Sequence, residues 1–238
     1  MLTINQLTGF AGQGKHAQAS FIANDTNTSL TIGTHNSTFS SENLGPASPN
    51  RLIAVCIAAQ QLSTTTASIG INSVTIGGIS AQIVANTSSF TGIGGAGNAA
   101  ASCIAYIENS LLTSGDIVVN YTAAITGSNS GNRITIGIYN INNQNNVTPY
   151  DNQIDSHINT GTSFSYNIDV PLLGCVLGAA SSARNTSTMS FTNLTDTVND
   201  GQGSLIGHNN VASIGALSVT INNTATILAA TLSLASWQ

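Results

Sequence analysis

The stretch Arg133-Ile-Thr-Ile-Gly-Ile-Tyr-Asn-Ile141 decides the fold class of this chain. Its isoleucines recur at every second position from 134 to 138, which places them on one face of an extended strand. Asp116–Thr122 repeats the same period with Ile117, Val119 and Tyr121. No window of a dozen residues carries apolar side chains at helical spacing. We therefore expect an all-β protein.

Working outward, short β-branched runs separated by Gly, Asn and Ser clusters recur along the whole sequence. The tetrapeptide Ile76-Gly77-Gly78-Ile79 predicts a tight hairpin, because two glycines supply the positive φ angles of a type I′ turn. The expected strands are Ala19–Ala23, Ser29–Gly33, Arg51–Gln60, Ser73–Ile76, Ala81–Ala85, Ala101–Glu108, Asp116–Thr122, Arg133–Ile141, Ser163–Val170, Cys175–Ser181, Met189–Leu194, Ala216–Ile221 and Ile227–Ala235.

Many short strands with regular turn signals predict an antiparallel β-sandwich of jelly-roll type. The breaks between strands are short and no repeat of fixed period is visible, so residues 17–238 are expected to form a single sandwich domain. The first sixteen residues, with Gly9, Gly12 and Gly14, are expected to form an extended N-terminal arm. Three longer polar stretches are expected to be loops at the ends of the sandwich, namely Thr87–Asn98, Asn142–Thr162 and Asp196–Ser213.

The composition is poor in charge and rich in uncharged polar residues. Charged residues make up 5% of the 238 residues, with four cations, nine acids and a net charge of −5, while Asn, Ser and Thr number 28, 29 and 29. Lys15, Arg51, Arg133 and Arg184 are too few and too scattered to neutralise a phosphate backbone, so a nucleic-acid partner is excluded. The 41% of hydrophobic residues argues against disorder.

So neutral a surface carries little self-repulsion, and it suits a protein packed in an assembly better than a free monomer. The N-terminus has no basic start followed by an apolar core, so no signal peptide is expected. No apolar stretch approaches the ~20 residues that span a bilayer, so no membrane partner is expected either. These features indicate a protein made in the cytosol of the producing cell.

No motif in the sequence predicts a catalytic, cofactor-binding or metal-binding site. Cys56, Cys103 and Cys175 lie in apolar runs and are expected to be buried free thiols. The run Gly92–Gly97 satisfies G-x-G-x-x-G, but no strand, helix and acidic residue surround it as in a dinucleotide fold. A glycine loop is the better interpretation.

The histidines and acids also lack the spacing of a site. No two of His16, His35, His157 and His208 stand two or four residues apart. Asp151 and Asp155, which flank Asn152, could ligate calcium, although the dense ladder of recognised calcium loops is missing.

Catalysis has no better support. The sequence contains no nucleophile elbow, and the acids stand mostly in turns, so a non-enzymatic protein is expected. Aromatic residues are few, and Trp237 is expected to pack at the sandwich edge or against a neighbouring subunit.

The order of short motifs resembles a family of β-sandwich proteins encoded by tailed bacteriophages and prophages. The resemblance runs from about residue 17 to the C-terminus. The motifs that carry it are Ser48-Pro-Asn-Arg-Leu-Ile-Ala-Val55, Ile71-Asn-Ser-Val-Thr-Ile-Gly-Gly-Ile79, Ala105-Tyr-Ile-Glu108, Ser114-Gly-Asp-Ile-Val-Val-Asn-Tyr121, Ile136-Gly-Ile-Tyr139, Asp169-Val-Pro171, Val176-Leu-Gly-Ala-Ala180, Ser190-Phe-Thr-Asn-Leu-Thr195, and Ala229 through Trp237.

The resemblance implies a virion-associated structural protein with a jelly-roll-like core and supplies no catalytic residues to transfer. The expected function is that of a capsid decoration or cement protein, forming a homo-oligomer such as a trimer and contacting the major capsid protein or other virion proteins. Deletion of Met1–His16 is expected to abolish incorporation into the particle if the arm is the anchor. The alternative is a tail-fibre or receptor-contacting module, whose polar loops would touch a host glycan or protein.

Overall fold

A computed structural model describes residues 16–28, 30–63, 69–93, 96–126, 131–183, 188–224 and 227–238. Within these ranges every regular element is a β-strand and every strand pair is antiparallel. The expected all-β antiparallel sandwich architecture is therefore confirmed. The predicted N-terminal arm lies outside the described residues except for His16. No helix in the described part has the length and hydropathy needed to cross a membrane.

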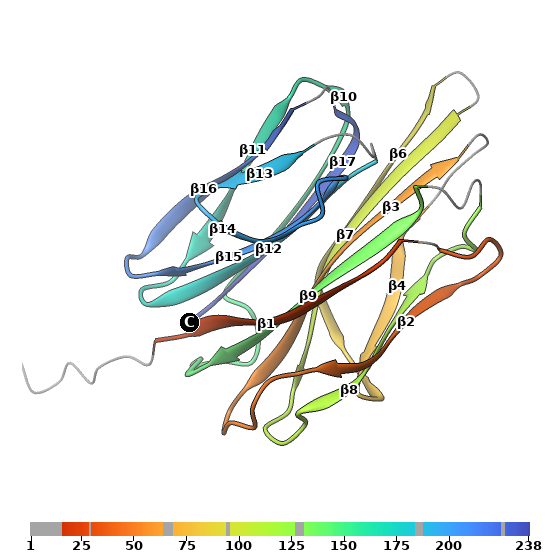
Figure 1. Cartoon of the computed structure of the whole chain (residues 1–238). Helices are drawn as coiled ribbons and strands as arrows, with labels where there is room; N and C mark the ends of the chain where they lie inside the picture. The colour runs from red at the N-terminus through yellow and green to blue at the C-terminus, as the bar shows by residue number, and fades with distance from the viewer. Residues whose placement is uncertain are drawn as a thin grey trace, which may run out of the picture.

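The strands form two sandwiches that lie back to back, as Figure 1 shows. The first sandwich has an inner sheet in the order β1-β9-β3-β7-β6 and an outer sheet in the order β2-β8-β4-β5. Its strands are β1 (Gln18–Asn27), β2 (Asn36–Asn43), β3 (Leu52–Ser63), β4 (Ile71–Ile76), β5 (Ile79–Ser80), β6 (Gln82–Ile93), β7 (Ala96–Glu108), β8 (Ser114–Tyr121) and β9 (Arg133–Asn142).

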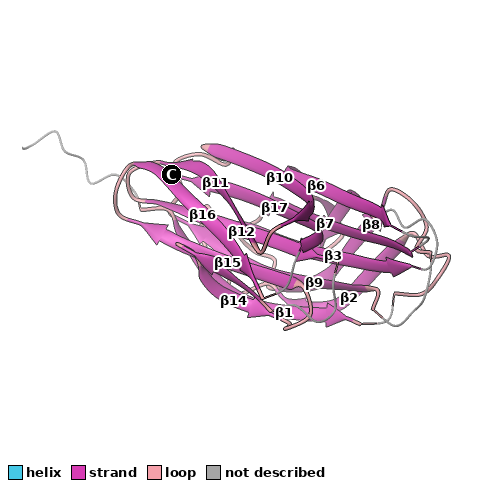
Figure 2. Cartoon of the chain, turned by 90° about the horizontal axis from the view of Figure 1, so that it is seen from above, coloured by secondary structure: helices cyan, strands magenta, loops and turns pink. Residues whose placement is uncertain are grey.

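The second sandwich has an inner sheet in the order β10-β17-β12-β15-β14 and an outer sheet in the order β11-β16-β13. The two inner sheets face each other, and in Figure 2 the strands of both sandwiches run along the length of the molecule. The strands of the second sandwich are β10 (Asp151–Thr160), β11 (Ser163–Val170), β12 (Gly174–Ser182), β13 (Met189–Thr192), β14 (Thr195–Asn199), β15 (Ser204–Val211), β16 (Gly215–Asn223) and β17 (Ile227–Trp237).

Both sandwiches have the strand order of a jelly roll, and the second repeats the first. The inner sheets have equivalent strand orders: β1, β9, β3, β7 and β6 correspond in turn to β10, β17, β12, β15 and β14. The outer order β2-β8-β4 likewise matches β11-β16-β13. The described part of the chain thus contains an internal repeat of topology, although its sequence shows no repeat of fixed period. The prediction of a single domain over residues 17–238 stays a prediction, but this strand order divides that range into two sandwiches.

The reason that no period is visible lies in the spacing of matched strands. β1 and β10 begin at residues 18 and 151, whereas β9 and β17 begin at residues 133 and 227. The offset between matched strands therefore shrinks along the chain, because several strands and most connections of the second sandwich are shorter than their counterparts. A repeat search at fixed spacing cannot align such copies.

Three large apolar cores fill the spaces between the four sheets, and a small cluster of Ala100, Ala183 and Ala229 lies apart from them. The first, with Ile53, Val55 and Ile136, lies between the outer and inner sheets of the first sandwich. The second, with Leu52, Tyr139 and Trp237, joins the two inner sheets, and the third fills the second sandwich. β9 is apolar on both faces, because it serves the first and the second core. The two sandwiches consequently share a core.

The interface between the inner sheets changes from apolar to polar along its length. Near the chain termini it holds Leu52, Tyr106 and Trp237. Farther from the termini along the same strands, the side chains between the two inner sheets are small or polar. Fully buried polar residues at this polar end include Gln60, Ser102, Thr135, Ser181, Ser204, Thr231 and Ser233.

Most expected strands are present, but one expected strand and the three expected loops are wrong. At Ser29–Gly33 the described residues form a turn, in which the Thr34 hydroxyl donates to the Thr31 carbonyl at 2.7 Å. The next strand begins after this turn, at Asn36, and is β2. The Gly77-Gly78 hairpin is confirmed, since both residues have positive φ and Ile76 pairs with Ile79.

The three stretches expected to be loops contain strands instead. Thr87–Asn98 covers much of the β6–β7 hairpin, Asn142–Thr162 contains β10, and Asp196–Ser213 contains most of β14 and all of β15. These strands are rich in polar residues because β6, β10 and β14 are sheet edges, where one side of a strand stays open to solvent.

Candidate functional site

The glycine run does not form a nucleotide site. Gly92 and Ile93 end β6, while Ala96 and Gly97 begin β7, and these two strands are antiparallel neighbours. A dinucleotide fingerprint instead leads from a strand into a helix. Positions 94 and 95 lie outside the described residues.

The histidines are spread over different parts of the fold. His157 pairs with Asp155 at 2.6 Å between Nε2 and Oδ2, and His208 packs against the Tyr139 ring at 5.5 Å between centroids. Burial lowers the pKa of His208. Among the described residues no three His, Cys, Asp or Glu side chains gather around a point that could hold a metal ion.

The acids considered for calcium already have protein partners. Asp151 accepts hydrogen bonds from the backbone N–H of Asp169 at 2.9 Å and of Asn152 at 2.8 Å, and from the Gln153 amide. Asp155 is occupied by His157. Both acids belong to strand β10, four residues apart, so the structure does not bring them together around one ion.

The three cysteines are buried free thiols, as expected. Burial raises the pKa of Cys103 and Cys175 to about 12 and that of Cys56 well above its usual range. Cys56 lies in the core shared by the sandwiches, whereas Cys103 faces the first core. These thiols are therefore packing residues and poor nucleophiles.

A concave surface surrounds Glu108, at the end of the molecule where Trp237 lies. Three adjoining cavities of about 330, 200 and 260 Å³ all include Glu108 in their lining, and we call them together the Glu108 groove. The lining is dominated by amide side chains and has an apolar rim. The amides are Asn50, Gln82, Asn109, Gln144, Asn145 and Asn146, and the rim residues are Ile79, Leu111 and Val147.

One wall of the groove is fixed by Arg51, which is fully buried. Its guanidinium donates to five backbone carbonyl oxygens and has no carboxylate partner among the described residues. The acceptors are Leu44 at 3.2 Å, Gly45 at 3.1 Å, Pro46 at 2.5 Å, Asn109 at 3.1 Å, and Leu112. Arg51 thereby ties the β2–β3 loop to the β7–β8 loop. Burial lowers the pKa of Arg51.

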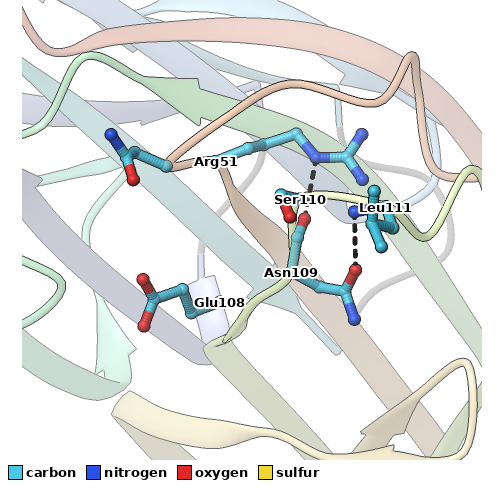
Figure 3. A pocket seen from close by; sticks show the side chains of 6 residues that line it. Arg51, Glu108, Asn109, Ser110 and Leu111 are labelled. Carbon is cyan, nitrogen blue, oxygen red and sulfur yellow. Dashed lines mark hydrogen bonds between the residues drawn. The ribbon is translucent and has the colours of Figure 1, made fainter.

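Asn109 shapes the same wall from the β7–β8 loop. Its side-chain oxygen Oδ1 accepts from the backbone N–H groups of Leu111 at 2.9 Å and Leu112 at 2.8 Å. Figure 3 shows the Asn109–Leu111 bond and the bond from Arg51 to the Asn109 carbonyl. The Glu108 side chain points away from the Arg51 guanidinium in this view. Its carboxylate has no hydrogen-bond or ion-pair partner among the described residues.

The other wall is the connection between the two sandwiches, residues 143–150. The Gln144 side-chain amide donates to the Asn50 carbonyl, and the Trp237 indole N–H donates to the Val147 carbonyl at 3.1 Å. Gln144 is only 6% exposed, and its side-chain oxygen Oε1 is buried without a hydrogen-bond partner among the described residues. The groove walls are thus held by hydrogen bonds that leave acceptors free.

A second notable surface is formed by two strand edges. β6 pairs only with β7 and β10 pairs only with β17, so each strand has a long side without a strand partner in the described part of the chain. The two strands lie beside each other, and the Ser89 hydroxyl donates to the His157 carbonyl at 3.1 Å. Ile154 and Ile158 of β10 are 48% and 50% exposed. We call this surface the β6–β10 edge.

Sequence reasoning missed both surfaces. The sequence pattern presents Glu108 only as the last residue of an expected strand and of the Ala105-Tyr-Ile-Glu108 motif, and it predicts a loop where β10 lies. Arg51 offered one signal, since an isolated cation inside a Pro49-Asn50-Arg51-Leu52 turn of a charge-poor chain invites the question of what it binds.

Comparison with known proteins finds no matching family model, no similar protein among those with curated descriptions, and no similar solved structure.

Proposed function

We propose that this chain is a non-enzymatic structural protein of a tailed-phage virion, a decoration or cement protein of the capsid exterior. The β6–β10 edge is the observation that carries the proposal. Through this edge the protein would join a second copy or a neighbouring virion protein.

An open strand edge is a template for pairing with another chain, and proteins that stay monomeric protect it. The usual protections are charged side chains, proline, bulges or a covering element. β6 and β10 contain no lysine, arginine or proline, and β6 has a single register shift, near its start. The two acids of β10, Asp151 and Asp155, are half-buried and hydrogen-bonded within the protein, whereas Ile154 and Ile158 are exposed. An edge of this kind favours lateral association.

The charge distribution supports the same role. Among the described residues the only contacts between acidic and basic side chains are Arg133 with Asp200, at 3.5 Å, and His157 with Asp155, which is an ion pair only when the imidazole is protonated. A surface of hydroxyls, amides and isoleucines can be buried between subunits with little cost for desolvating ions. Contacts of this kind between subunits would stabilise a capsid shell through the surface area that they bury.

The first experiment is the copy number of the chain in purified particles, measured by quantitative mass spectrometry against the major capsid protein. Hundreds of copies per particle would support the cement role. A few dozen or fewer would place the chain on the tail, and absence from the particle would refute a virion role altogether.

The edge is tested with the double variant Ile154→Lys/Ile158→Lys. Two lysines on the open strand should prevent incorporation and lateral association while the protein stays folded. The matched control is Ser218→Lys/Asn222→Lys, which adds the same charges at the same spacing to exposed positions of β16, a central strand. Equal incorporation of both variants would refute the role of the edge.

A further inference from the structure

We infer that the Glu108 groove binds a neutral saccharide chain. This property goes beyond the assembly role proposed above. The groove lies at the end of the molecule near Trp237, whereas the β6–β10 edge runs along the side of the molecule.

The charge of the groove limits the ligand class. Glu108 places an unpaired carboxylate in all three cavities. The one cation of the lining, Arg51, has its guanidinium committed to backbone carbonyls. A phosphate, a sulfate or an acidic sugar would meet a like charge with no cation free to balance it. The ligand is therefore neutral or cationic.

The hydrogen-bonding groups favour a neutral polyol over a cation. The side chains of Asn50, Asn145 and Asn146 each offer a donor and an acceptor, and Glu108 offers two acceptors. A sugar hydroxyl both donates and accepts, so it can use this mixture, whereas an ammonium or guanidinium group only donates. Two adjacent hydroxyls of one sugar ring can donate to the two oxygens of one carboxylate.

Gln144 provides an independent observation. Its side chain is 6% exposed, lines the middle cavity and carries an oxygen, Oε1, that lacks a partner among the described residues. A buried acceptor without a partner is costly. Oε1 is closed off from solvent in this structure, so the Gln144 side chain must turn toward the cavity before a donor of a bound ligand satisfies it.

The rim suits the apolar faces of sugar rings. Leu111 is 79% exposed and Ile79 is 41% exposed, so each can cover the C–H face of a ring at the groove margin. Three adjoining cavities fit a chain of sugar units better than one small molecule. Because Arg51 and Trp237 hold the walls by hydrogen bonds, binding requires little ordering of the loops.

The test uses the whole chain of 238 residues and five probes at millimolar concentration: maltopentaose, mannopentaose, the pentamer of N-acetylglucosamine, sialyllactose and pentalysine. Saturation-transfer NMR and calorimetric titration are expected to show binding of at least one neutral oligosaccharide and none of sialyllactose. Glu108→Ala should weaken this binding by about tenfold or more, and Glu108→Gln by less, because the amide retains one acceptor.

The matched control is Glu42→Ala, which removes the only other glutamate of the chain, on β2 and outside the groove. It should bind as the parent does. Three results would overturn the inference: no binding of any neutral probe by the folded protein, equal binding by Glu108→Ala, or a Glu108-dependent preference for pentalysine. None of them bears on particle incorporation, so this inference and the cement role fail separately.

Discussion

The hydroxyl of Ser102 on β7 and the hydroxyl of Ser233 on β17 lie 2.9 Å apart and join the inner sheets of the two sandwiches. The Ser233 hydroxyl also donates to the Ser102 carbonyl at 3.0 Å. Both side chains are fully buried. Each sandwich thus contributes one serine to a contact that neither could complete alone.

This geometry predicts an asymmetry between the two single variants. Ser233→Ala leaves the buried Ser102 hydroxyl without this partner and should cost about 1–3 kcal/mol of unfolding free energy. Ser102→Ala should cost less, because the Ser233 hydroxyl still donates to the Ser102 carbonyl. Urea unfolding of both variants and of the double variant measures the coupling. Equal costs for the two single variants would contradict the hydrogen-bond assignment.

A strand of this protein can be predicted from the sequence when its apolar side chains face a core. The apolar pattern of Arg133–Asn142 predicts this interior strand, because its apolar side chains pack into two cores, one on each face. β10 was missed because its half-buried positions are Asp151, Gln153, Asp155 and His157, while its isoleucines face solvent. Hydropathy patterns assume the reverse, so an edge strand that presents apolar side chains to solvent is invisible to them.

The groove could not be predicted for a different reason. Its walls come from residues 44–51, 108–112 and 143–147, which only the tertiary fold brings together. No sequence motif around Arg51 predicts its role, because backbone carbonyls, which every residue has, are its hydrogen-bond partners. The jelly-roll class follows from local strand and turn signals, whereas the pairing of two such units follows from contacts between residues more than a hundred positions apart, such as Ser102 and Ser233.

Gln60 leads to a second prediction, of increased stability. Its side chain is fully buried, and neither of its amide atoms has a hydrogen-bond partner among the described residues. Gln60→Met keeps the length of the side chain and removes the unpaired polar atoms, so it should raise the unfolding free energy by about 1 kcal/mol. The check is the urea midpoint of the variant. A loss of stability would show that the amide is hydrogen-bonded in solution.

Arg51 should be among the most sensitive positions of the first sandwich. Arg51→Met leaves five carbonyl oxygens of two loops without their donor and should cost about 3–5 kcal/mol. Arg51→Lys should recover only part of this, because an ammonium group cannot reproduce the planar fork of donors.

The comparison for Arg51 is Arg133→Met. Arg133 is largely buried and has two side-chain partners, Gln202 at 2.8 Å and Asp200 at 3.5 Å, where Arg51 has five carbonyl acceptors, so its loss should cost about 1–3 kcal/mol. Thermal and urea unfolding of the three variants give the ranking. A cost for Arg51→Met no larger than that for Arg133→Met would refute the loop-tying role of Arg51.

His208 makes the second sandwich sensitive to mild acid. Burial against Tyr139 lowers its pKa below the usual value of 6.5, and its ring nitrogen Nδ1 is buried without a hydrogen-bond partner among the described residues. As the pH falls through 6.5 the unfolded chain takes up this proton before the folded protein does. The contribution of His208 to stability is therefore complete at higher pH and is lost as the pH falls.

The measurement is the urea midpoint at several pH values between about 7.5 and 5.5, where an unperturbed histidine titrates. The midpoint should fall toward the acid end for the parent protein and fall less steeply for His208→Gln, which cannot take up a proton there. Asp196, whose pKa is raised by burial, acts in the opposite direction, and it does so nearer its usual value of 3.8. Parallel curves for parent and variant would show that His208 stays exposed to solvent in the folded protein.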